Sequence, residues 1–290
     1  MKVLITGCSG QVGHCLTKRL KTQADILALD YNGLDITNRE AVFNTVAEFR
    51  PKYIINAAAH TAVDRAEQEV EISYAINCDG PGYLAQAAKE YGAIMLHIST
   101  DYVFDGMGDK PYQEGDSAGP QGVYGQSKLA GELAVAEACP EHLILRTAWV
   151  FGEHGNNFVK TMLRLAQSRD ELSIVGDQFG GPTYAGDIAD ALITMVRYIE
   201  KGMQPQWGVY HFSGMPYASW YDFASAIFQA AEQQNVLHKR PKLSSIQTSA
   251  YATPAKRPAN SRLDCSKIKN QFGIKPSDWH VALNDIQAYK

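Results

Sequence analysis

Short apolar runs alternate with amphipathic segments over the first half of the chain. The apolar runs are three to six residues long, and Asp25 and His97 are the only charged or titratable polar side chains among them apart from Tyr53. Continuous apolar runs of this length are typical of strands that helices cover on both faces, as in parallel sheets. We therefore predict strands at Val3–Ile5, Asp25–Leu29, Tyr53–Ile55, Ala93–Ile98 and Leu143–Leu145.

The segments between these strands carry helical patterns. Cys15–Leu20, Arg39–Phe49 and Cys78–Tyr91 are amphipathic, and Pro51 ends the second of them before the next strand. Thr37 and Glu40 have the spacing of a capping box at the start of that second helix. Alternation of strands and helices predicts an α/β fold, a Rossmann-type doubly wound parallel sheet.

The pattern changes after about residue 150. Glycine and proline cluster at Gly176–Pro182 and at Ser213–Pro216. A helix is expected over Asp222–Gln233, because Ser219 stands three residues before Asp222 as in a capping box. The segment Thr253–Ser261 is rich in proline and is expected to be an ordered loop or an edge crossing.

This change divides the chain into two predicted parts. Residues 1–150 are expected to form a dinucleotide-binding domain and residues 151–290 a smaller substrate-binding lobe. Residues 187–214 are expected to return to the first domain, through a helix at Asp187–Tyr198 and a strand at Val209–Phe212.

Composition excludes several classes of protein. The formal net charge is −4 and no dense basic run is present, so neither a nucleic acid nor an anionic membrane is an expected partner. The five scattered cysteines form no C-x-x-C pair, which favours reduced thiols in a cytoplasmic protein. Neither a secretory signal nor an apolar stretch of bilayer length appears in the sequence.

A glycine-rich turn follows the first predicted strand. Gly7, Gly10 and Gly13 are spaced G-x-x-G-x-x-G and lead into the first helix. Glycines at such a turn let the backbone approach a pyrophosphate, which the helix N-terminus then attracts. Asp30 ends the second strand and can accept hydrogen bonds from an adenosine ribose, which favours NADH over NADPH. We predict a nicotinamide dinucleotide site here.

Three further residues suggest reductase chemistry. Tyr124 and Lys128 are four apart and would share one helix face. The ammonium of Lys128 is expected to lower the pKa of the Tyr124 phenol, so that the phenol can protonate a carbonyl oxygen. Thr100 ends the fourth strand, at the sheet edge where ligands bind, and can donate to the same oxygen.

Five segments together resemble the extended short-chain dehydrogenase/reductase superfamily and, within it, the dTDP-4-dehydrorhamnose reductase family. The resemblance covers essentially the whole chain. The segments are Asn56–Glu67, Ser99–Gly106, Arg146–Gly152, Asp177–Thr183, and Arg257-Pro258 with Ser261-x-Leu263-Asp264.

The resemblance implies reduction of the 4-keto group of dTDP-4-dehydro-L-rhamnose with NADPH or NADH. The implied catalytic residues are Thr100, Tyr124 and Lys128, and the implied substrate contacts are Thr100, Asp101, Trp149, Asn157, Gln178 and Arg257. Lys128 would also bind the nicotinamide ribose. The implied cofactor site comprises Gly7, Gly10, Gln11, Val12, Gly13, Asp30, Asp35, Ile36, Ala57, Ala58, Ala59, Thr61, Tyr124 and Lys128.

Several alternatives stay open from the sequence. Some members of the family hold magnesium between subunits through a carboxylate two residues past the third glycine. This chain has Cys15 at that position, so no metal is expected, and the chain would be a monomer or homodimer.

Another 4-reductase, a 4-epimerase and a non-catalytic cofactor-binding subunit are the competing functions. A 4,6-dehydratase is disfavoured because Tyr102, and not a glutamate, follows Asp101. His60 and His97 are expected to be hydrogen-bonded structural residues, and Glu67 and Glu69 to be solvated.

Overall fold

A six-stranded parallel sheet forms the centre of the computed structural model, which describes residues 1–290. Its strand order is β10-β5-β4-β3-β1-β2, and all five pairings are parallel. The order reverses between β1 and β3, which is the switch point where doubly wound sheets bind ligands. The strands are β1 (Lys2–Thr6), β2 (Asp25–Leu29), β3 (Tyr53–Asn56), β4 (Ile94–Thr100), β5 (His142–Thr147) and β10 (Gly208–His211).

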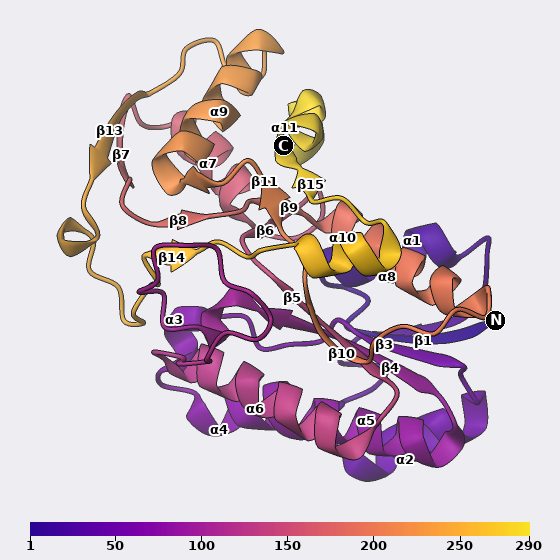
Figure 1. The fold of residues 1–290 in the computed structure, drawn as a ribbon. Helices are drawn as coiled ribbons and strands as arrows, with labels where there is room; N and C mark the ends of the chain where they lie inside the picture. Colours follow the sequence, from indigo (N-terminus) through magenta and orange to yellow (C-terminus); the bar gives the residue numbers. More distant parts are fainter.

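Helices cover both faces of this sheet, as the doubly wound prediction requires (Figure 1). Two apolar clusters fill the two helix–sheet interfaces. The first face carries α1 (Gln11–Leu20), α8 (Ala185–Glu200) and α10 (Ser266–Phe272); the second carries α2 (Arg39–Phe49), α5 (Gly80–Tyr91) and α6 (Val123–Ala138). Residues 187–214 therefore correspond to α8 and β10, which lie against the first sheet.

Three of the strands continue past the apolar runs that predicted them. β3 extends to Asn56, β4 to Thr100 and β5 to Thr147. The added residues are polar and buried, and the side chains of Asn56 and Arg146 hydrogen-bond to partners on neighbouring strands or helices. Hydropathy alone ended the strands too early because it does not register polar groups that are paired inside the fold.

Local capping explains two further differences from the prediction. The α2 helix begins after Asn38, whose side chain accepts a hydrogen bond from Ala41 N, so the predicted Thr37–Glu40 capping box is wrong. Thr37 instead donates its hydroxyl to Asp35. The helix expected from Cys78 begins at Gly80, because a wider π-type turn, η1 (Ala75–Asp79), precedes it. The α5 helix ends at Gly92, which adopts left-handed φ of 70°.

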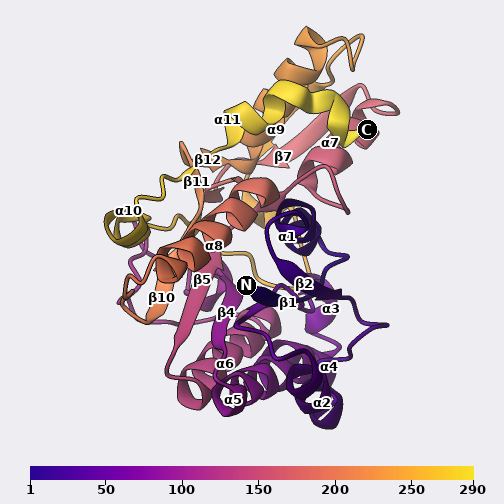
Figure 2. The same cartoon turned by 90° about the vertical axis from the view of Figure 1, so that its right-hand side faces the viewer.

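The second lobe has its own apolar core, built mainly from helices and aromatic side chains. It contains α7 (Phe158–Ala166), α9 (Trp220–Gln233) and α11 (Trp279–Ala282), with β7 (Glu171–Val175) paired to β13 (Lys242–Ile246). The lobe lies beyond α8, at the opposite end of the molecule from α2 and α5 (Figure 2). The predicted capping box of Ser219 and Asp222 is confirmed, although α9 begins two residues earlier than expected.

Short strand pairs and turns connect the two lobes. The strand pairs are β6 (Val150–Phe151) with β9 (Thr183–Tyr184), β8 (Phe179–Gly180) with β12 (Ala218–Ser219) and β14 (Asn260–Ser261), and β11 (Gly214–Met215) with β15 (Ser277–Asp278). The short helices are α3 (Val63–Ala66), α4 (Val70–Tyr74), η2 (Asp101–Val103), η3 (Thr248–Ala250) and η4 (Leu283–Tyr289). Residues 253–259 form a loop that leads into β14. None of the helices combines the length and the hydropathy needed to span a bilayer.

Candidate active site

The glycine turn lies at the switch point of the sheet. Gly7 has φ of +71°, and a Cβ atom there would lie 2.5 Å from the backbone nitrogen of Ala58, just after β3. A Cβ atom on Gly13 would collide with the carbonyl oxygen of Gly7. Both positions therefore require glycine, one for its backbone conformation and one for the close approach of α1 to the turn.

The start of α1 suits an anionic ligand. Gly10 is its N-cap, no side chain caps the helix, and its first turn contains no acidic residue. The first N–H groups of a helix carry partial positive charge and attract phosphate. The turn therefore fits the pyrophosphate of a dinucleotide, with Gln11 and Val12 in the first helical turn beside it.

The other predicted cofactor residues surround this turn. Asp30 follows β2, and its Oδ1 accepts hydrogen bonds of 3.1 Å from the backbone N–H groups of Asn32 and Gly33. Asp35 accepts from Thr37, and Ile36 is buried against Gly80. Ala57, Ala58 and Ala59 follow β3 directly beneath the glycine turn, and Thr61 is exposed just beyond them.

Thr100 and Asp101 lie at the carboxyl end of β4 and are both buried. The hydroxyl of Thr100 donates to Asp101 Oδ1 at 2.9 Å and accepts from Tyr102 N. The other carboxylate oxygen, Oδ2, is buried and makes no well-aligned hydrogen bond. Burial raises the pKa of Asp101 to about 6, because a buried carboxylate loses its hydration.

Tyr124 lies in the first turn of α6, and its phenol lies beside Thr100. The expected lowering of the Tyr124 pKa is wrong. Burial raises that pKa and outweighs the lowering by Thr100, and the negative charge of Asp101 adds a smaller rise. The phenol is therefore held protonated, which is the form that donates a proton.

Lys128 lies one turn further along α6 but is directed to β4. Its ammonium group donates to the Ile98 carbonyl at 2.7 Å and lies 3.3 Å from His97 Nε2. The side chain is only 2% exposed, and burial lowers its pKa to about 8. Lys128 makes no resolved contribution to the pKa of Tyr124, and its ammonium group is directed to β4 and not to the phenol.

The start of α6 is fixed by a residue that the sequence did not assign. Glu67, from the segment after α3, accepts a hydrogen bond of 2.9 Å from Val123 N through Oε1. The prediction that Glu67 is merely solvated is therefore wrong, whereas Glu69 pairs with Arg65 and His60. Because Gly122 offers no capping side chain, this carboxylate satisfies the helix start one residue before Tyr124.

Trp149 lies in the connection between β5 and β6. It has a left-handed backbone, with φ of 47°, and its ring stacks on Trp220 with centroids 3.5 Å apart. A Cβ atom on Gly180 would touch the Trp149 ring, so β8 packs closely against it. Trp149 is partly exposed and joins the second lobe to the end of β5, on the side of Thr147 and Thr100.

Arg257 reaches the centre from the loop before β14. Its Nη2 donates to Asp64 Oδ2 at 2.7 Å, and its Nη1 lies 3.4 Å from the Tyr102 hydroxyl. The Tyr102 ring meets Tyr124 edge to face, with centroids 5.4 Å apart. Tyr102 and Asp64 were not predicted as site residues, although both lie inside segments that carried the family resemblance.

Two predicted substrate residues serve other contacts. Asn157 donates to Gln11 Oε1 and to the Gly152 carbonyl, and its Oδ1 accepts from Lys160 N. It therefore joins α7 to the glycine turn. Gln178 is buried and donates to Thr248 Oγ1 at 3.1 Å.

The structure brings Thr100, Asp101, Tyr124, Lys128 and Arg257 together around β4 and α6.

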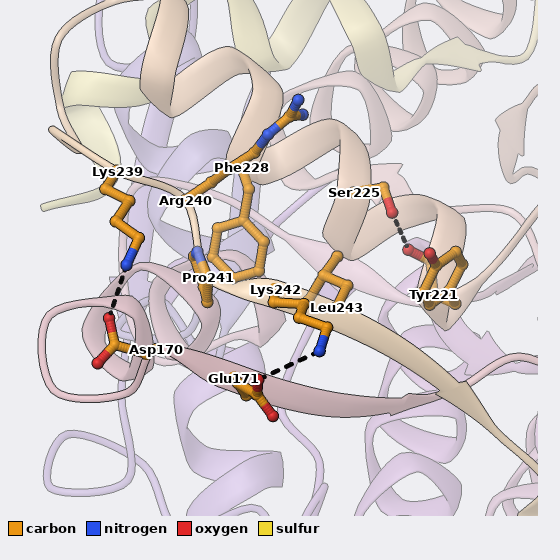
Figure 3. A pocket seen from close by; sticks show the side chains of 10 residues that line it. All are labelled: Asp170, Glu171, Tyr221, Ser225, Phe228, Lys239, Arg240, Pro241, Lys242 and Leu243. Carbon is orange, nitrogen blue, oxygen red and sulfur yellow. Dashed lines mark hydrogen bonds and ion pairs between the residues drawn. The ribbon is translucent and has the colours of Figure 1, made fainter.

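A separate groove of about 550 Å³ lies in the second lobe, between α9 and the β7–β13 pair (Figure 3). Lys239 pairs with Asp170 and Lys242 with Glu171 at its rim. Arg240 pairs with Glu232. Because each cation already has a carboxylate partner, the groove offers no unbalanced charge to a ligand.

The sheet order, the glycine turn and the Thr–Tyr–Lys group define a Rossmann-fold protein of the extended short-chain dehydrogenase/reductase class. The family described as RmlD substrate binding domain matches residues 1–289. The chain is 52% identical to the dTDP-4-dehydrorhamnose reductase of Aggregatibacter actinomycetemcomitans, over 99% of each chain. It belongs to the dTDP-4-dehydrorhamnose reductase family.

Solved structures agree with this assignment. A dTDP-4-dehydrorhamnose reductase from Clostridium acetobutylicum matches with a TM-score of 0.91 and 40% identity, over 99% of this chain and 98% of that one. The dTDP-4-dehydrorhamnose reductase of Bacillus anthracis, solved in complex with NADP, matches with a TM-score of 0.90 and 37% identity, over 100% and 99% of the two chains.

Proposed function

We propose that the chain reduces the 4-keto group of dTDP-4-dehydro-L-rhamnose to give dTDP-L-rhamnose, with NADPH or NADH as the reductant. The observation that carries the proposal is the position of the Tyr124 phenol, which is held protonated beside Thr100 at the carboxyl end of β4. The family assignment supplies the substrate, since its named members act on this sugar nucleotide.

The residues of the site have distinct roles in this proposal. When bound, the reduced nicotinamide supplies a hydride to C4 of the sugar. Tyr124 donates its phenolic proton to the C4 oxygen as charge develops there, and Thr100 donates a second hydrogen bond to that oxygen. Lys128, in its ammonium form, binds the nicotinamide ribose through its N–H donors.

The substrate side is proposed to lie between β4 and the second lobe. Asp101, with its free Oδ2, is suited to accept a hydrogen bond from a sugar hydroxyl. Trp149 offers a partly exposed aromatic ring to the sugar. Arg257 can exchange Asp64 for a phosphate oxygen of the diphosphate, because a guanidinium binds either anion in the same fork geometry. Gln178 and Asn157 hold the loops around this space.

The cofactor residues are proposed to act as a cradle around the glycine turn. Asp30 remains the residue that would contact the adenosine ribose, and it shares its Oδ1 with two backbone N–H groups. Ala57, Ala58, Ala59 and Thr61 line the path from this ribose towards Tyr124. Assembly as a monomer or homodimer, the absence of a nucleic-acid partner and a cytoplasmic location stay predictions.

A turnover assay with the purified chain tests the proposal. dTDP-4-dehydro-L-rhamnose is offered with NADPH and with NADH, while cofactor absorbance and the sugar product are followed together. We expect one cofactor oxidised for each dTDP-L-rhamnose formed. Isomerised keto sugar with unchanged cofactor would indicate an epimerase, and cofactor binding without turnover would indicate a regulatory subunit. Either result contradicts the proposed function.

A further inference from the structure

A row of buried polar side chains crosses three strands of the central sheet on the face covered by α6. Thr6 of β1 is in register with Asn56 of β3, and Asn56 is in register with His97 of β4. The exposed fractions of these side chains are between 0% and 1%. The proposed catalytic scheme uses none of them. Burying three polar groups inside a parallel sheet is costly unless their hydrogen bonds are satisfied.

The hydrogen bonds of this row have a fixed direction. Asn56 Oδ1 accepts from the Thr6 hydroxyl at 2.7 Å and from Ala58 N at 3.0 Å. A backbone N–H can only donate, so this oxygen cannot exchange places with the amide nitrogen. Asn56 Nδ2 must therefore donate to His97 Nδ1, which lies 3.0 Å away.

This direction determines the tautomer of His97. Because Nδ1 accepts from Asn56, a neutral His97 ring carries its proton on Nε2. Nε2 lies 3.3 Å from Lys128 Nζ. The imidazole therefore presents an N–H donor to the lysine nitrogen, which an uncharged amine can accept and an ammonium group cannot. The ammonium form keeps its hydrogen bond to the Ile98 carbonyl but faces a second donor at His97.

We infer that His97 is a positioning residue of the proposed reductase, whose Nε2–H group, oriented by Asn56, holds Lys128 and weakens its hold on a proton. This inference rests on the proposed function, in which Lys128 acts beside Tyr124. It adds a role for the Thr6–Asn56–His97 row, which orients the lysine from within the sheet face that α6 covers and not through the cofactor.

The charges around Lys128 agree with this role. Burial lowers the pKa of Lys128, and burial together with Lys128 lowers the pKa of His97, so His97 stays neutral. Glu132, one turn further along α6, raises the Lys128 pKa, but Arg146 of β5 pairs with that carboxylate at 2.6 Å.

The remaining elements packed against α6 add little charge. Their buried residues include Ser73 of α4 and Asn77 of η1, neither of which titrates. Asp101 of η2 faces Tyr124, and His142 of β5 is bonded to the Cys139 carbonyl at the opposite end of the strand. His97 is therefore the side chain that faces Lys128 Nζ, beside the Ile98 carbonyl.

Two NMR measurements on the full-length chain without substrate test the inference. In wild type with ¹⁵N-labelled histidine, we expect the His97 proton on Nε2. In chain with ¹³Cε-labelled lysine, the resonance that is lost in Lys128→Met should titrate near pH 8. A proton on Nδ1 of His97 would overturn the inference without any variant of the row.

Three variants then separate the row from simple packing. His97→Leu removes the N–H donor that faces Lys128. Asn56→Asp replaces the amide donor by a carboxylate, which accepts a hydrogen bond from His97 Nδ1–H and so leaves Nε2 as an acceptor towards Lys128. In both, the Lys128 midpoint should rise by about one pH unit, a tenfold change in proton affinity. Met95→Leu, a buried apolar neighbour on the same strand, should leave it unchanged. Equal midpoints in wild type and both row variants would contradict the inference.

The same variants give a kinetic readout. With the keto sugar, wild-type kcat/KM should fall as pH rises through the Lys128 midpoint, because the ammonium form is then lost. In His97→Leu and Asn56→Asp, this fall in kcat/KM should occur at a higher pH, by the same amount as the Lys128 midpoint measured by NMR. A fall at the wild-type pH in both variants would refute the role of His97. If wild type shows no turnover at all, the proposed function fails. The NMR titrations need no substrate, so they still test whether His97 lowers the proton affinity of Lys128.

Discussion

The two faces of the central sheet are built differently although the same strands supply both. On the α1–α8 face, every strand of the sheet except the edge strand β2 contributes fully buried apolar residues, and the cluster contains no charge. On the α6 face, the strands carry polar side chains near their carboxyl ends, where His97, Arg146 and His211 are buried. The first face stabilises the fold by packing, and the second fixes the positions of the groups beside Tyr124.

The largest expected effect comes from breaking the buried ion pair of the polar face. Arg146 and Glu132 are 6% and 4% exposed, and two hydrogen bonds join them. Glu132→Leu leaves the guanidinium buried without its partner, so the free energy of unfolding should fall by about 3–5 kcal/mol. On the apolar face, Ile55→Val should cost only about 0.5–1.5 kcal/mol. Chemical denaturation of both variants checks the contrast, and equal losses would contradict it.

A smaller effect is expected from the titration of Asp101. Its pKa is raised from 3.8 to about 6 in the folded chain, so protonation favours folding. The stabilising contribution is present below about pH 4 and is lost as pH rises through 6. Relative to Asp101→Asn, wild type should therefore lose about 3 kcal/mol between these limits, from ~1.4 kcal/mol per pKa unit. Denaturation at pH 4 and pH 7 measures the difference, and a constant difference would exclude the raised pKa.

The smallest of these effects concerns the glycine turn. A Cβ atom on Gly13 would strike the Gly7 carbonyl, whereas one on Gly115 would meet no atom within 4 Å. Gly13→Ala should therefore weaken NAD(P)H binding by about tenfold or more, the factor that corresponds to ~1.4 kcal/mol of misfit. Gly115→Ala should bind like wild type. Calorimetric titration with cofactor compares them, and wild-type affinity in Gly13→Ala would remove the turn from the cofactor site.

The sequence predicted the parts of the fold that depend on local patterns. The parallel strands, the glycine turn and the Ser219 capping box follow from hydropathy, backbone freedom and short-range hydrogen bonding. The polar ends of β3, β4 and β5 could not be predicted in this way, because their stability depends on partners far along the chain. Asn56 and His97, for instance, are 41 residues apart.

The candidate site shows the same limit. The spacing of Tyr124 and Lys128 placed both on one helix, but not the direction in which Lys128 points. The pKa of Tyr124 was predicted in the wrong direction, because burial raises it and the Lys128 ammonium group is directed to β4 instead. Glu67, Tyr102 and Asp64 were missed as contacts of this site, since only the folded chain brings α3 and the loop before β14 to α6.

The central claim is that Tyr124 gives the proton to the sugar ketone, and Tyr124→Phe tests it most directly. Turnover of dTDP-4-dehydro-L-rhamnose is compared in wild type, Tyr124→Phe and Tyr102→Phe, the last being the ring that meets Tyr124 edge to face. We expect Tyr124→Phe to bind cofactor and unfold like wild type but to lose about 10²–10⁴-fold in kcat, with a much smaller loss in Tyr102→Phe. Wild-type turnover in Tyr124→Phe would contradict the account.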